Sequence, residues 1–194
     1  MAPRLVTDAQ LIDRLSDLFR RVGYDGASLG AIAMATGLQK SSLYHRFPGG
    51  KQQMAAEASA SVIEEFAASV LAPIGSDAPL EERVAAIAAN LDRFYDGGTR
   101  FCLVDMLSIG DPGADAASNL AAAVAAWIAV FAAIAREAGA DDATARSRAE
   151  DAIATIEGAL VVARVTGDTS SFRRAVAGLP DHLLSRPCNL LSRR

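Results

Sequence analysis

Apolar residues along this chain recur at the spacing of α-helices. In the first segment Leu11, Leu15, Leu18 and Val22 lie three or four positions apart, so they share one face of a helix. No stretch alternates apolar and polar residues or gathers β-branched ones, as a half-buried strand would. Alanine, the strongest helix former, is roughly a fifth of the chain. The pattern predicts an all-α fold.

Local start and stop signals divide the first fifty residues into three helices. Thr7 caps the first helix while Gln10, three positions later, reaches back as in a capping box, and Gly23 ends it. Ser28 caps the second helix, which ends at Gly37. The predicted ranges are 7–22, 28–36 and 39–47.

Longer helices fill the rest of the chain and are separated by glycine and proline. The three short helices of residues 1–50 have the dimensions of a helix-turn-helix domain. We therefore expect one domain over residues 1–50 and a larger helical one over residues 51–194. The longer helices are predicted at residues 51–72, 80–96, 101–109, 115–138, 142–166 and 169–178.

Charge is unevenly distributed between these two parts. The whole chain has a net charge of −4, which argues against a nucleic-acid partner because phosphate binding depends on Lys and Arg. Residues 1–60, however, hold seven basic and five acidic side chains, so the negative excess lies in the remainder. We expect an anionic polymer to bind the N-terminal third and a neutral, cationic or protein partner to bind the rest.

Cysteine usage and the first residues predict a cytoplasmic protein. Cys102 and Cys188 lie far apart, and the chain lacks the basic start and apolar run of a secretory signal. The longest stretch without a polar residue, 120–135, is shorter than the ~18–20 residues that cross a bilayer. No membrane partner is expected.

The third short helix divides into an apolar side and a polar side. Leu43 and Phe47 lie four positions apart and can face the core. Lys40, Ser41, Tyr44 and His45 fall largely on other faces and form a strip of hydrogen-bonding groups. A recognition helix needs this division, because its apolar side holds it in the domain while its polar side enters the major groove of DNA.

The residues from Ser28 to Lys51 resemble the DNA-binding domain of the TetR family of transcriptional regulators. In that family a stretch S-L-x-x-I-A-x-x-A-G-V/L is followed by L-Y-x-H/Y-F and then a lysine. Residues 28–38 resemble the first part, and residues 43–47 with Lys51 resemble the second. Three further stretches, Phe47-Pro48-Gly49-Gly50-Lys51, Cys102-Leu103 and Ile156-Glu157-Gly158-Ala159-Leu160, are similar to the LmrA/YxaF-like subgroup.

The resemblance implies DNA contacts along the third helix. Its first residues approach base edges or phosphates, its aromatic residues touch the DNA backbone, and Lys51 grips a phosphate beside the positive end of the next helix. Gln39 stands where the family often has a Ser cap, and Arg46 where it often has His or Tyr, so a relative's operator sequence does not transfer. The expected DNA-binding residues are Ser28, Lys40, Ser41, Ser42, Tyr44, His45, Arg46 and Lys51.

Each of these residues taken alone has an ordinary structural explanation. Tyr44 or His45 on a short helix is otherwise a half-buried aromatic side chain, and Lys51 a solvated surface charge. Arg4, before the first helix, is either a flexible DNA-binding arm or a stray surface charge. The joint pattern and the family resemblance favour DNA binding.

One long helix carries a candidate dimer interface. Its apolar residues recur near a/d spacing, and Gly158 in mid-helix costs about 1 kcal/mol relative to Ala unless another helix approaches closely. The alternative is a helix packed within its own chain. The resemblance implies that this helix and residues 171–177 form a four-helix bundle with a second copy. The expected interface residues are Ala149, Ile153, Ile156, Gly158, Leu160 and Ala163.

Large side chains gather in the middle helices. Such residues usually form core, but the resemblance implies an apolar pocket for a small, largely apolar effector. A Cys102 thiolate beside Arg100 would react with electrophiles, whereas a buried thiol would be inert. The expected ligand-binding residues are Phe66, Phe94, Tyr95, Phe101, Cys102, Met106, Trp127 and Phe131.

These features together predict a homodimeric repressor that binds a palindromic double-stranded operator and is released by its effector. A regulator that needs a corepressor, or an activator, would use the same parts. The rivals from other classes are a helical-bundle enzyme and a nonspecific DNA-binding protein. His45 and His182 are the only histidines and have no metal-ligand spacing, and no nucleotide-binding or nucleophile motif is present. No catalytic residue, metal or cofactor is therefore expected.

Overall fold

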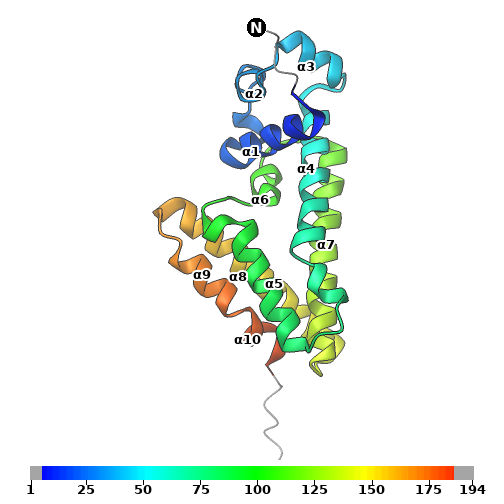
Figure 1. The fold of residues 1–194 in the computed structure, drawn as a ribbon, viewed down its shortest axis with the longest axis vertical. Coiled ribbons are helices and arrows are strands. Elements are labelled where there is room, and N and C mark those ends of the chain that lie inside the picture. Colours follow the sequence, from blue (N-terminus) through cyan, green and yellow to red (C-terminus); the bar gives the residue numbers. More distant parts are fainter. Residues whose placement is uncertain (1–5, 186–194) are drawn as a thin grey trace, which may run out of the picture. The chain divides into compact units, whose positions relative to one another are not determined.

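Residues 6–185 are described by a computed structural model, in which every regular element is a helix (Figure 1). Arg4 and Cys188 lie outside the described residues. The all-α prediction is confirmed. The α-helices are Asp8–Gly26 (α1), Leu29–Thr36 (α2), Lys40–Arg46 (α3), Gly50–Ser69 (α4), Leu80–Phe94 (α5), Leu103–Ser108 (α6), Ala114–Glu137 (α7), Asp142–Thr166 (α8), Ser170–Ala177 (α9) and Leu179–Leu184 (α10), and Ala72–Gly75 (η1) and Asp96–Gly98 (η2) are short 3-10 helices.

The caps that the sequence predicted for the first two helices are present. The Thr7 hydroxyl accepts from the Gln10 backbone N–H, and the Gln10 side chain accepts from the Thr7 N–H, each at 3.2 Å. This is the capping box that satisfies two otherwise unpaired donors. The Ser28 hydroxyl caps α2 by accepting from Ala31 N at 3.1 Å, and Gly37 ends α2 in the left-handed conformation.

Gly23 breaks the helix as predicted, and one further turn follows it within the bounds of α1. Its φ of +69° interrupts the helix, which then continues for one further turn to Gly26. A side chain at this position would lie 3.2 Å from the backbone oxygen of Met106, so α6 packs directly against the bend. Glycine is required here for both the positive φ and the close approach.

The remaining helices begin and end within three residues of their predicted positions. The helix α10 had no counterpart in the prediction. It contains Pro180 at its second position, where the missing N–H of proline has no partner in a helix anyway. The two 3-10 helices were also not predicted, because each is a single short turn.

The chain divides into two compact units. Unit 1 comprises residues 1–66 and 100–123, and unit 2 comprises residues 67–99 and 124–194. Unit 1 therefore contains α1, α2, α3 and α6 whole, together with most of α4 and the start of α7. The helices α4 and α7 each continue from one unit into the other.

Each unit has its own apolar core. In unit 1 the fully buried side chains include residues from each of the first four helices and from the turn that follows α3. In unit 2 the Tyr95 ring packs edge-on against Phe94 and Phe172, with ring centroids 5.1 and 5.8 Å apart. Gly98 makes this possible, because a Cβ there would lie 2.9 Å from the Phe172 ring. The fully buried side chains of unit 1 include Leu15, Phe19, Ile32, Leu43, Phe47 and Met54.

Among the described residues α7 is long and apolar enough by composition to cross a bilayer. An 18-residue stretch of α7 has a mean hydropathy of 1.9, and 28% of that stretch is buried. A soluble protein's core helix passes the same compositional test. The prediction that the chain lacks a membrane partner stays a prediction.

Candidate nucleic-acid interface

The helix α3 is anchored by one side and exposed on the other. Leu43 and Phe47 are 1% and 0% exposed, so they fix α3 against the rest of unit 1 as their spacing predicted. The polar positions lie in solvent, and Tyr44 is 50% exposed. Within residues 6–185 these side chains have no hydrogen-bond or ion-pair partner. The exposed polar residues of α3 are Lys40, Ser41, Ser42, Tyr44 and His45.

Gln39, which precedes α3, is also exposed and makes no side-chain cap hydrogen bond. In the sequence Gln39 stands where the family often has a Ser cap, and it was not among the expected DNA-binding residues. Its amide has two donors and one acceptor beside Lys40, so it belongs to the same hydrogen-bonding surface. The missing cap was the signal that could have identified it.

Arg46 differs from the other polar residues of α3, because its guanidinium faces the protein. Its Nη1 and Nη2 donate to the two carboxylate oxygens of Glu57 on α4, at 3.3 and 2.9 Å. Its Nε lies 3.5 Å from Asp8 on α1, and the guanidinium carbon lies 4.7 Å from the centre of the Phe47 ring. The hydrogen bond to Glu57, followed by the Glu57 and Asp8 charges, raises the pKa of Arg46, and burial opposes this.

Glu57 is held in turn by its own helix. Gln53, one turn earlier on α4, donates from Nε2 to Glu57 Oε1 at 2.8 Å. The Gln53 oxygen accepts from the backbone N–H of Gly49, in the turn between α3 and α4, also at 2.8 Å. We call this network of Asp8, Arg46, Gly49, Gln53 and Glu57 the clasp. The sequence analysis did not identify Gln53 or Glu57.

Lys51 joins the start of α4 to the end of α1. Its ammonium donates to the backbone oxygen of Tyr24 at 3.0 Å and lies 4.0 Å from the centre of the Tyr24 ring. Burial, followed by the carboxylates of Asp111 and Asp25, raises the pKa of the Tyr24 phenol. Lys51 is half-buried and keeps donors beyond the one used here, since an ammonium has three. Ser28, by contrast, uses its hydroxyl as the α2 cap and is exposed.

The eight residues predicted to bind an effector fall in both compact units. Phe66, Phe101, Cys102 and Met106 belong to unit 1, and the other four belong to unit 2. In unit 2 the Trp127 and Phe131 rings pack edge-on at 5.8 Å between centroids. Cys102 is 4% exposed, which favours the inert-thiol alternative. Effector contact by these residues stays a prediction.

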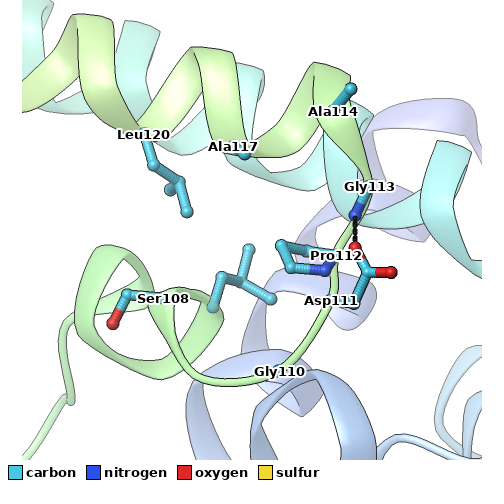
Figure 2. A pocket seen from close by; sticks show the side chains of 9 residues that line it. Ser108, Gly110, Asp111, Pro112, Gly113, Ala114, Ala117 and Leu120 are labelled. Carbon is cyan, nitrogen blue, oxygen red and sulfur yellow. Dashed lines mark hydrogen bonds between the residues drawn. The ribbon is translucent and has the colours of Figure 1, made fainter.

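Unit 1 contains a cavity of about 530 Å³ between α6 and the start of α7 (Figure 2). Pro112 and Leu120 face it, and Asp111 accepts from Gly113 N at 3.3 Å in the loop that forms one wall. None of the eight predicted ligand-binding residues lines this cavity. Its lining residues are Leu107, Ser108, Gly110, Asp111, Pro112, Gly113, Ala114, Ala117 and Leu120.

Five of the six predicted interface residues pack inside unit 2. Ala149, Ile153, Ile156, Leu160 and Ala163 are each less than 9% exposed, so they offer almost no area to a partner. They follow the alternative of a helix packed within its own chain, because the most apolar stripe of α8 covers its own core. Gly158 lies on the other side, with open space where a Cβ would be. The exposed face of α8 also carries Ala154, Val162 and Val165.

Two family models match the chain. A model described as "Bacterial regulatory proteins, tetR family" matches residues 11–58, and one described as "Transcriptional regulator LmrA/YxaF-like, C-terminal domain" matches residues 78–177. The HTH-type transcriptional regulator LmrA of Bacillus subtilis is 43% identical over 49 residues, which are 25% of this chain and 26% of LmrA. The aligned stretch thus spans about a quarter of that relative.

Solved structures of similar fold cover nearly the whole chain. A TetR regulator from Legionella pneumophila is 19% identical, with a TM-score of 0.78 over 93% of this chain and 99% of its own. FadR of Bacillus subtilis, in complex with stearoyl-CoA, is 15% identical, with a TM-score of 0.72 over 92% and 98%. A cysteine-substituted CifR complexed with 26-base-pair operator DNA is 25% identical, with a TM-score of 0.74 over 96% and 100%.

Proposed function

Because the chain belongs to the TetR family of transcriptional regulators, in its LmrA/YxaF-like subgroup, we propose that it is a ligand-responsive repressor that binds a palindromic operator as a homodimer. The observation that carries this proposal is the division of α3. Its apolar side is buried while Lys40, Ser41, Ser42, Tyr44 and His45 are exposed without partners among the described residues. Exposed side chains without a partner in the protein can replace their hydrogen bonds to water with hydrogen bonds to base edges and phosphates at little cost in free energy.

A dimer gives the affinity that one short recognition helix lacks. Two half-sites about 34–36 Å apart, or a multiple of that spacing, present successive major grooves to two copies of α3. The exposed face of α8 supports pairing with a second copy, because Ala154 and Gly158 allow close approach of another helix. Val162 and Val165 are 48% and 77% exposed and would bury apolar area there. CifR bound to operator DNA supports the same mode of recognition.

The effector would act by shifting a population between two conformations. In one of these conformations the recognition helices no longer match successive grooves. A ligand that binds this conformation more tightly lowers operator affinity, at most by the ratio of its affinities for the two conformations. FadR bound to stearoyl-CoA supports a ligand with a large apolar part for a chain of this fold. We propose a cytoplasmic location. The proposed effector-contacting residues are Phe66, Phe94, Tyr95, Phe101, Cys102, Met106, Trp127 and Phe131.

Selection of bound DNA from a random pool tests the proposal. We expect a palindromic consensus, and we expect the purified chain to prefer it over unrelated duplex by at least roughly a thousandfold at physiological salt. Equal binding to unrelated competitor would identify a nonspecific DNA-coating protein. Recovery of no enriched sequence and no retarded fragment would contradict DNA recognition altogether. The variant Arg146→Ala, which removes an exposed cation from α8, is the control and should select the same consensus.

A further inference from the structure

Arg46 is the only residue of α3 whose cationic group is already bound to two other helices of unit 1. Its fork is bidentate on Glu57 of α4, and its Nε faces Asp8 at the start of α1. Paired parallel N–H to oxygen contacts fix the orientation of a guanidinium as well as its position. The last turn of α3 is therefore tied to α4 and α1 by directional contacts, in addition to the buried Leu43 and Phe47.

Both oxygens of the Glu57 carboxylate accept hydrogen bonds from neighbouring side chains. It accepts from two nitrogens of Arg46 and from Gln53 Nε2. Gln53 extends the network to Gly49 in the α3–α4 turn, so the clasp holds both ends of that turn. The side chains of Arg46 and Glu57 are 34% and 31% exposed, so water screens the pair. The network contributes mainly by fixing the orientation of α3, because four directional hydrogen bonds converge on the Glu57 carboxylate and the Gln53 amide.

We propose that Arg46 is a positioning residue, which sets the angle of the recognition helix on α4, and that it does not contact DNA. This inference rests on the proposed function, because it concerns how α3 is presented to an operator. Base and phosphate contacts from α3 then fall to the residues before Arg46 along the helix. Lys40 is the cation left on α3 for reading guanine. We therefore expect that recognition of the selected operator does not require a guanidinium group from α3.

The two roles for Arg46 predict opposite effects for Glu57→Gln. If Arg46 positions α3, removing the carboxylate loosens the helix, and operator affinity should fall by roughly three- to tenfold. If Arg46 instead binds phosphate, removing its competitor frees the guanidinium, and operator affinity should rise. Glu64→Gln, an exposed glutamate of the same helix, controls for the general loss of one negative charge.

Salt dependence separates positioning from phosphate contact at Arg46 itself. The logarithm of the binding constant falls with the logarithm of salt concentration by about 0.9 for each phosphate neutralised. We expect Arg46→Gln and Arg46→Lys to weaken operator binding while this slope stays unchanged. A slope lower by about 0.9 in Arg46→Gln, with near-normal binding by Arg46→Lys, would overturn the inference. Arg46→Lys keeps the charge and loses the fork, so it remains informative if Arg46→Gln unfolds.

A charge exchange gives the decisive test. In an Asp8→Asn background, which removes the carboxylate that would face a glutamate at position 46, the double variant Arg46→Glu with Glu57→Arg restores an ion pair in the same place with reversed polarity. A positioning role predicts that the double variant regains most of the operator affinity lost by Arg46→Glu alone, as measured by fluorescence anisotropy on the selected operator. A double variant as weak as Arg46→Glu would overturn the inference, because a glutamate at position 46 cannot replace a phosphate-binding cation. Failure of the wild-type chain to bind any selected DNA would instead reject the proposed function.

Discussion

The helices α3 and α8 present opposite kinds of surface to solvent. Polar side chains cover the exposed face of α3, whereas small apolar residues line part of the exposed face of α8, from Ala154 to Val165. Hydrated polar groups lose little by standing in water and gain specificity when a partner offers matching donors and acceptors. Exposed apolar groups gain by leaving water, whatever the detailed chemistry of the partner. The first surface suits DNA, and the second suits another helix of similar shape.

The two helices also differ in how they are held. The 7-residue α3 depends on two buried side chains, the clasp and the turn after it, because a helix so short is marginal alone. The 25-residue α8 buries eight residues within its own unit and needs no such support. A substitution on the exposed face of α8 should therefore change association and leave folding intact.

The largest expected effect comes from placing a charge in the exposed face of α8. In Val162→Glu a partner helix would have to bury a carboxylate without a counter-charge, which opposes association. We expect the variant to sediment as a monomer at micromolar concentration. Operator affinity should fall by at least roughly a hundredfold, because a monomer loses the second half-site.

Arg146→Glu is the control for this variant, since it adds negative charge on the flank of α8 away from Val162. It should remain dimeric. A Val162→Glu chain that still sediments as a dimer with full operator affinity would place the pairing surface elsewhere, and the contrast between α3 and α8 would no longer hold.

Lys40→Ala tests the polar surface of α3 and should give the next largest effect. Loss of a base contact costs about 1–3 kcal/mol and relaxes specificity at one position of each half-site. Random-pool selection with the variant should therefore return the same palindrome with one degenerate position. Uniform weakening over all sequences would show that Lys40 binds phosphate only. The melting temperature should equal that of the wild-type chain, since the Lys40 ammonium makes no hydrogen bond or ion pair with residues 6–185.

Lys51→Met should reduce both stability and DNA binding, by smaller amounts. The hydrogen bond to the Tyr24 oxygen and the contact with the Tyr24 ring are lost, so the unfolding free energy should fall by about 1 kcal/mol. A phosphate contact by Lys51 would in addition lower the salt slope by about 0.9. Denaturant titration and salt-dependent anisotropy measure the two effects separately. An unchanged unfolding free energy would show that the Tyr24 contact contributes nothing.

Features that depend on neighbours in sequence could be predicted from it. The Thr7 and Ser28 caps and the Gly37 terminus are set by one or two turns of chain, and each is present as expected. The division of α3 was equally accessible, because only Leu43 and Phe47 are apolar at helical spacing. Gly23 breaks the helix as its position predicted, but the further turn to Gly26 and the packing of α6 against Gly23 depend on tertiary structure.

Features that depend on tertiary packing could not be predicted. Arg46 and Glu57 lie eleven positions apart across a turn, so nothing in their spacing indicates a pair. In α8 the a/d pattern identified the more apolar face, and that face belongs to the helix's own core. The less apolar stripe around Gly158 is the one that remains exposed. When a helix has two apolar faces, periodicity alone does not say which one is internal.

The smallest expected effect concerns how α3 and α8 begin. Gln39 makes no side-chain cap for α3, whereas the Asp141 carboxylate accepts from the Thr144 backbone N–H and hydroxyl, each at 2.9 Å. The backbone hydrogen bond, followed by the hydroxyl bond, lowers the pKa of Asp141. A carboxyl whose pKa is lower in the folded state stabilises the fold above its unfolded value of about 3.9. That stabilisation is lost as the pH falls through the folded pKa.

Asp141→Ala should therefore lower the melting temperature slightly at pH 7, and the difference from the wild-type chain should shrink as the pH falls below about 5. Operator affinity at pH 7 should be unchanged, because the cap lies outside both the DNA-binding and the pairing surfaces. Asp92→Ala, which removes an exposed aspartate of α5, is the control for the loss of one carboxylate at pH 7. A melting-temperature difference that is constant from pH 7 to pH 3 would mean that Asp141 stabilises α8 through its shape and not its charge, and the charged cap would not distinguish α8 from α3.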